Sequence, residues 1–187
     1  MAIKTFTTGE VLTAADTNTY LNNGGLVFVK QVTVGSAVAS VNITSCFSAT
    51  FENYVVSISN VTASAGGNIF RARLLSGTTA ITTGVYGNTF YIANGAAGGL
   101  TNGALSNVSY SEVGCISSVS KNGTVFRVEQ PFLANYTRFN FSDSDENYWR
   151  FGAFVHRANT SYDGLQIDVN TGTITGGTIT VYGYRLG

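Results

Sequence analysis

The alternation of apolar and polar residues from Leu26 onward constrains the fold of this chain more than any other feature. Eight short segments rich in Val, Ile, Phe, Tyr and Thr are bounded by Gly, Asn and Ser, as strands usually are: 26–34, 54–61, 69–75, 124–129, 136–141, 149–157, 165–169 and 178–185. Within one of them, Phe139 and Phe141 share a face and Arg138 lies on the other. Half-buried antiparallel strands have this pattern. With no helix signal after residue 25, it predicts an all-β fold, an antiparallel β-sandwich with a jelly-roll-like topology.

Composition limits the partners that we expect. The chain has 187 residues, enough for one domain, and only 11% of them are charged, against about 25% in a typical soluble protein. Ten basic and ten acidic residues give a net charge of zero, and the basic ones are spread from Lys4 to Arg185. Nucleic-acid binding needs a concentrated positive field, so we exclude it. A weakly charged surface resists self-association poorly, which favours packing against other subunits over a protein that stays alone in an uncrowded niche.

The sequence contains no recognisable targeting signal and no cysteine spacing typical of a zinc site or a disulfide framework. Residues 1–23 hold no apolar stretch of the length found in signal peptides, and no segment resembles a membrane span, so we expect no membrane partner. Cys46 and Cys115 lie far apart beside apolar neighbours. This spacing favours buried structural thiols over a zinc site or a disulfide framework, and hence assembly in a reducing cytoplasm.

The first 25 residues form a segment of another kind. Thr13 is a predicted N-cap with Asp16 in a capping-box arrangement, and the Gly24-Gly25 pair is a plausible stop. A helix of about ten residues is too short to be stable alone in water, so it needs a surface on which to dock. We therefore divide the chain into an arm, 1–25, and a sandwich, 26–187. The alternative is that the arm folds back and covers an edge of its own sheet.

Residues 84–107 interrupt the rhythm of the strands because they are rich in Gly and Asn and poor in charge. They predict a long ordered loop at one end of the sandwich, with at most a short strand around Phe90 to Ile92.

The search for catalytic or metal-binding residues predicts neither an enzyme nor a cofactor. His156 is the only histidine, it lies on an apolar strand segment, and no serine sits in a G-x-S-x-G elbow. Asp143, Asp145 and Asn147 have the opening spacing of a calcium loop, but the glycine and the closing glutamate of such a loop are missing. We therefore expect a solvated turn there and no metal.

Both ends of the chain carry a resemblance. The segment FTTGEVLTAADTNTYL resembles the N-terminal segment of bacteriophage virion proteins, and GGTITVYGYR is similar to the last strand of phage β-domains. The first match rests on Phe6, Gly9, Leu12, Thr13, Ala14, Ala15, Asn18 and Leu21. Together the two segments cover about 30 residues, and the stretch 30–170 matches no family that we can name. The resemblance implies a virion location and a non-enzymatic structural role as a tail fibre, minor tail protein or head decoration.

These observations combine into an expected phage appendage, a homotrimer that contacts other virion proteins. Its anchor comprises Phe6, Leu12, Tyr20 and Leu21. In one role the sandwich recognises host-surface glycans through the 84–107 loop and exposed aromatic residues, namely Tyr86, Tyr91 and Trp149. In another role it is a decoration protein that reinforces capsid joints. A third reading is a free carbohydrate-binding module, which would have no use for the arm.

The last strand segment suggests where subunits meet. Ile179 and Val181 fall on one face, and Tyr182 and Tyr184 fall on the other. A strand needs two apolar faces only when both are covered, so we expect the tyrosines at a subunit interface. The alternative is that they lie partly exposed over an adjacent strand.

Overall fold

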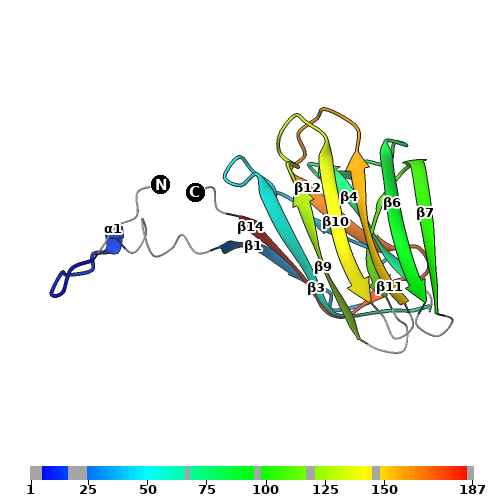
Figure 1. The fold of residues 1–187 in the computed structure, drawn as a ribbon, viewed down its shortest axis with the longest axis horizontal. Coiled ribbons are helices and arrows are strands. Elements are labelled where there is room, and N and C mark those ends of the chain that lie inside the picture. The colour runs from blue at the N-terminus through cyan, green and yellow to red at the C-terminus, as the bar shows by residue number, and fades with distance from the viewer. Residues whose placement is uncertain are drawn as a thin grey trace.

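The computed structural model of this chain describes residues 6–16, 25–65, 68–94, 98–116, 121–144 and 148–184. Almost all of its regular structure is β, arranged as two antiparallel sheets that pack face to face (Figure 1). The prediction of an all-β, jelly-roll-like sandwich with a short helical segment on its N-terminal arm is therefore confirmed.

The larger sheet has nine strands. They run in the order β1 (Leu26–Thr33), β14 (Thr178–Tyr184), β3 (Asn53–Ala63), β9 (Asn122–Glu129), β10 (Thr137–Ser144), β11 (Tyr148–His156), β6 (Tyr86–Asn94) and β7 (Gly99–Val108), and β13 (Ile174–Thr175) also pairs with β3. The smaller sheet has the order β2 (Ser40–Ile43), β12 (Gly164–Val169), β4 (Asn68–Ser76) and β5 (Thr79–Ala80), and β8 (Ser111–Ile116) also pairs with β4. All eight predicted strand segments contain strands of this sandwich.

Alternation along the strands sorts side chains between the core and the surface, as the sequence predicted. On β10, Phe139 and Phe141 are buried and Arg138 is exposed. The inward faces of both sheets supply most of the largest fully buried side chains, namely Tyr54, Tyr86, Phe70, Phe126, Phe139, Phe154, Ile43, Ile58, Leu74, Ile116 and Leu165. Burial of these apolar surfaces is the main favourable term that holds the two sheets together.

The loop predicted over 84–107 is wrong, because most of this segment is the hairpin of β6 and β7. Its glycines permit close packing. A Cβ atom on Gly103 would lie 2.3 Å from the ring of Phe90, its register partner on β6. The glycine thus makes room for a large ring in a strand, where the sequence alone suggested a turn.

The N-cap predicted at Thr13 is confirmed in the structure of the arm. The Asp16 backbone N–H donates to Thr13 Oγ1 at 3.1 Å, and the Thr13 N–H donates to an Asp16 carboxylate oxygen at 3.2 Å. Helix α1 spans Ala14–Asp16, and the rest of the predicted helix lies outside the described residues. Residues 6–15 are all exposed, so this part of the arm does not cover a sheet edge. No helix in the described ranges is long and apolar enough to cross a membrane.

Candidate functional site

His156 lies in the interior and not at a reactive surface. Its side chain is fully buried between the rings of Tyr86 and Tyr162, at centroid distances of 4.5 and 5.0 Å. Burial lowers the pKa of this imidazole to about 4, so it is neutral at pH 7. Among the described residues, neither ring nitrogen has a hydrogen-bond partner. The arrangement fits a core position and offers no nucleophile for the imidazole to activate.

The cysteines and Asp143 lie in the interior, so the solvated turn expected from Asp143 onward is wrong for Asp143, which is buried on β10. Cys46 and Cys115 are both buried, as predicted, and burial raises the pKa of the Cys46 thiol to about 12. Asp143 faces inward and its carboxylate accepts the backbone N–H of Cys115. Asp145 and Asn147 lie outside the described residues, and no group of three potential metal ligands occurs in the parts of the chain that are described.

A row of three aromatic rings stands on the outer face of the larger sheet. Trp149 and Phe151 are two positions apart on β11, so they point the same way, with ring centroids 4.9 Å apart. Tyr91 of β6 is the register partner of Phe151, and the two rings stack at 5.1 Å with an interplanar angle of 17°. Trp149 is 48% exposed and Tyr91 is 39% exposed, so this aromatic row is partly open to solvent.

A shallow hollow of about 410 Å³ lies beside the aromatic row, and Trp149 forms part of its wall. Hydroxyl groups and small residues line much of it, namely Ser57, Ser59, Gly123, Val125, Ser142 and Ser144. The indole Nε1–H of Trp149 donates to Ser142 Oγ at 3.3 Å, which orients the indole beside this serine hollow. An apolar ring face next to several hydroxyl donors and acceptors can bind a small polar molecule with an apolar side.

The opposite edge of the same sheet is apolar. On β1, Leu26 is 45% exposed and Phe28 is 61% exposed, and the Phe28 ring meets Tyr182 edge-on at 6.3 Å. Tyr182 and Tyr184 are half-buried on the side of β14 opposite Val181. The two faces predicted for this strand are therefore confirmed, and its tyrosines lie partly exposed beside the neighbouring strand.

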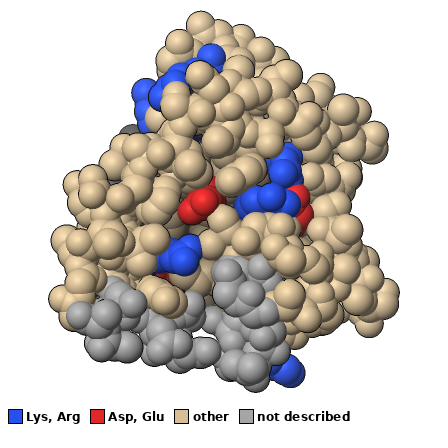
Figure 2. Space-filling model, turned by 90° about the vertical axis from the view of Figure 1, so that its right-hand side faces the viewer, with Lys and Arg blue, Asp and Glu red and all other residues tan. Residues whose placement is uncertain are grey.

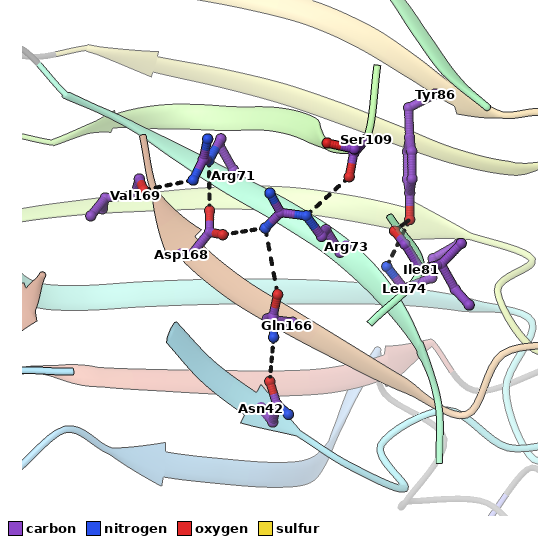
Figure 3. Close-up of polar contacts among 10 residues, drawn as sticks. All are labelled: Asn42, Arg71, Arg73, Leu74, Ile81, Tyr86, Ser109, Gln166, Asp168 and Val169. Carbon is purple, nitrogen blue, oxygen red and sulfur yellow. Dashed lines mark hydrogen bonds and ion pairs between the residues drawn. The ribbon is translucent and has the colours of Figure 1, made fainter. Parts of the chain in front are cut away.

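Charged residues form a separate cluster on the outer face of the smaller sheet. Arg71 and Arg73 of β4 both contact the carboxylate of Asp168 on β12 (Figure 3). Arg73 also donates to Gln166, whose amide donates to Asn42 of β2 at 2.8 Å. This chain of contacts joins three strands and places one carboxylate between two guanidinium groups.

An aromatic ring and a second carboxylate lie close to these guanidinium groups. Both guanidinium groups of this cluster lie over the ring of Tyr110, at 5.1 and 5.8 Å. Burial raises the pKa of Glu112, while the charges of Arg150 and Arg71 act against that rise. Figure 2 shows few charged atoms on the face that it presents, with blue and red atoms next to each other near the centre. The described cluster supplies no large field of one sign.

The structure brings together two of the three predicted glycan contacts and removes the third. Trp149 and Tyr91 stand in the aromatic row, but Tyr86 is fully buried, and its hydroxyl accepts the Leu74 N–H at 3.0 Å. The placement of Tyr86 at a ligand-contacting surface is therefore wrong, because Tyr86 occupies an inward position of β6. Phe151, which completes the row, was not predicted, although its spacing of two from Trp149 indicates a shared face.

The predicted anchor is only partly visible. Phe6 is 39% exposed and Leu12 is 49% exposed, while Tyr20 and Leu21 lie outside the described residues. Val11, which the sequence analysis did not single out, is 80% exposed. The described arm thus presents three apolar side chains to solvent.

Comparisons with known proteins give no family. No family model and no curated protein matches the chain. Among solved structures, the Caenorhabditis elegans galectin LEC-6 aligns with 12% identity and a TM-score of 0.36, over 84% of this chain and 99% of the galectin. CG-16, a homodimeric agglutinin from chicken liver, aligns with 9% identity and a TM-score of 0.32, over 76% of this chain and 98% of the agglutinin. Likeness at this level carries no argument about function.

Proposed function

We propose that this chain is a non-enzymatic structural component of a bacteriophage particle, an appendage whose sandwich binds saccharides on the host surface. The aromatic row beside the serine hollow carries the binding part of this proposal. Sugar rings have an apolar face that packs on exposed aromatic rings, and their hydroxyls need neighbours that both donate and accept hydrogen bonds. Trp149 and Ser142 offer these two features within one hydrogen bond of each other.

The virion location rests on the resemblance of the two terminal segments to phage proteins, together with the exposure of the arm. Phe6, Val11 and Leu12 lose water-exposed apolar surface only when they meet another surface. A surface on other virion proteins fits this need. The arm is then an anchor, and the sandwich projects from the particle.

The trimer is the second part of the proposal. Leu26 and Phe28 are exposed on an edge strand, next to the half-buried Tyr182 and Tyr184. Contiguous exposed apolar residues on a sheet edge are typical of subunit contacts. The same surface would serve the alternative role, a capsid decoration protein that packs against its neighbours. A free carbohydrate-binding module would use the aromatic row but not the arm.

Binding is testable with the protein's own fluorescence. Trp149 is the only tryptophan in the chain, so a saccharide that packs on the aromatic row must change the emission of the unmodified protein. We expect at least one polysaccharide or oligosaccharide from a broad panel of bacterial surface glycans to shift or quench this emission. The variants Tyr91→Ala and Phe151→Ala should weaken that response by tenfold or more, since each removes a ring of the row.

Tyr136→Ala is the matched control, because Tyr136 is an exposed aromatic residue just before β10 that does not line the serine hollow. It should leave the titration unchanged. If no glycan in the panel alters the emission, or if all three alanine variants respond alike, the aromatic row is not the binding surface.

The role of the arm needs its own experiment. A chain that begins at Leu26 should fold and keep its oligomeric state, because the core residues all lie downstream, but it should fail to join the particle. Unfolding or aggregation of the shortened chain would indicate that the arm is a structural cover. Copy number then separates the two virion roles, since a few to tens of copies indicate an appendage and hundreds indicate decoration.

A further inference from the structure

A second hollow continues the serine hollow across the outer face of the larger sheet. It measures about 550 Å³ and shares Val125 and Ser142 with the first. Its other lining residues come from five strands: Leu26, Val55, Phe126, Arg127, Asn140, Phe141 and Tyr184. The two hollows therefore form one groove, with Trp149 near one end and Arg127 near the other.

From this groove we propose that the ligand is an acidic polysaccharide, whose carboxylate or other anionic group binds Arg127 while a sugar ring of the same chain packs on Trp149. This inference rests on the proposed function and names its ligand class. A guanidinium can hold a carboxylate or a phosphate by two parallel hydrogen bonds, which gives both energy and orientation.

Arg127 is available for such a contact. It points outward from β9, and among the described residues it forms no ion pair or hydrogen bond. Its nearest acidic neighbour on the same face of β9, Glu129, accepts the side-chain N–H of Asn140 at 3.0 Å and lies opposite Arg138 in the register. Arg127 therefore has no carboxylate partner among the described residues, and its guanidinium can donate to a ligand.

The rest of the lining suits an anion and a sugar at this end. Asn140, the register partner of Arg127 on β10, contributes an amide, while Leu26 and Tyr184, which belong to the proposed subunit contact, bound the groove beyond Arg127. Asp143 is the only acidic residue that lines either hollow, and it is buried with its carboxylate on the Cys115 N–H. Its carboxylate therefore faces the core and is not presented at the surface of the groove.

The distance between the two ends sets the size of the ligand. Trp149 is level with Gly123 in the register, two strands away from β9, and Arg127 lies four residues further along that strand. At about 4.8 Å per strand and 3.4 Å per residue, the two Cα atoms are roughly 17 Å apart. No single sugar spans this distance, so a ligand that contacts both residues must be a chain of several sugars that crosses the strands obliquely.

The test uses the full chain and the emission of Trp149. Four acidic polymers serve as probes, namely polygalacturonate, alginate, hyaluronate and polysialic acid, each beside its neutral, carboxyl-esterified counterpart. We expect at least one acidic polymer to bind at least tenfold more tightly than its ester, with an affinity that falls as salt is added. The matching monosaccharide should bind far more weakly than the polymer.

Two variants separate the role of Arg127 from general charge. Arg127→Gln should lose about tenfold in affinity for the acidic polymer and keep its affinity for the ester, and Arg127→Lys should recover part of the loss. Arg138→Gln is the control, because it removes the same charge from a neighbouring strand outside the groove.

Three results would overturn the inference: no acidic polymer changes the emission, acidic and esterified polymers bind equally, or the two glutamine variants behave alike. These results are distinguishable from a failure of the proposed function itself. If a neutral glycan still binds at the aromatic row while Arg127→Gln has no effect, saccharide binding stands and its acidic specificity falls.

Discussion

Because His156 is buried, we expect this one side chain to lower the free energy of unfolding as the pH falls. The imidazole has a pKa near 6.5 in an unfolded chain, and burial lowers it to about 4 in the folded protein. Above pH 6.5 both states carry a neutral ring, and the residue adds no pH dependence. As the pH falls from 6.5 towards 4, the unfolded chain takes up a proton that the folded protein does not, so the free energy of unfolding falls.

The size of the effect follows from the two pKa values. Since a tenfold difference in proton affinity is worth about 1.4 kcal/mol, the free energy of unfolding should fall by about 2.5 kcal/mol between pH 7.5 and pH 4.5 because of this residue. His156→Phe replaces the ring by one that cannot titrate and that suits the aromatic neighbours. The variant should match or exceed the parent at pH 7.5, because it also removes two buried nitrogens that have no described partner.

Urea unfolding of the parent and His156→Phe at both pH values measures this directly. Other acid effects are shared by the two proteins and cancel in their difference, which should grow by about 2.5 kcal/mol in favour of the variant at pH 4.5. Tyr162→Phe is the control, because it keeps the imidazole and should keep the parent's pH dependence. NMR titration of the single histidine gives the folded pKa independently. A pH-independent difference, or a folded pKa near 6.5, would refute the reasoning.

Three further changes test other parts of the structure. Asp168→Asn leaves two guanidinium groups without their shared carboxylate, and urea unfolding should show a loss of roughly 2–4 kcal/mol at pH 7. Gly103→Ala places a methyl group against the Phe90 ring and should cost about 1–3 kcal/mol in the same assay, whereas alanine at the open position Gly99 should be tolerated. Tyr182→Ser combined with Tyr184→Ser should convert a trimer into a monomer with an unchanged circular-dichroism spectrum. Light scattering decides this last case, and an unchanged trimer mass would remove these tyrosines from the interface.

The strands were predictable because burial in a sandwich imposes a period of two on the sequence. Phe139 and Phe141 alternate with Arg138 for this reason, and the same rule assigned opposite faces to Val181 and Tyr182. The reciprocal contact of Thr13 and Asp16 was predictable because capping depends on residues three positions apart. These features rest on local chemistry.

The hairpin of β6 and β7 was not predictable in the same way. Glycine is weak in isolated strands, and its value at position 103 appears only when the ring of Phe90 is placed opposite it. Missing the hairpin also led to the error at Tyr86. Once 86–94 is a strand, the even position of Tyr86 points inward with Phe90, and the odd position of Tyr91 points outward.

The candidate site depends on pairings that no local pattern contains. Trp149 and Phe151 follow from their spacing on β11, but Tyr91 joins them only because β6 pairs with β11. Ser57 enters the same hollow from a strand almost a hundred residues earlier in the chain. Such neighbours are fixed by the order of strands in the sheet, and that order reflects packing of the whole sandwich.

Strand β11 shows how the fold and the candidate site can vary independently. Its inward positions, Phe154 and His156, are fully buried in the core, whereas Trp149 on the opposite face is half exposed. Substitutions on the outward face remove ring surface without opening a cavity between the sheets, so they should change ligand binding more than stability. Substitutions on the inward face should do the reverse. The inward face of β11 is therefore constrained by the stability of the core, whereas its outward face can be substituted to alter ligand binding.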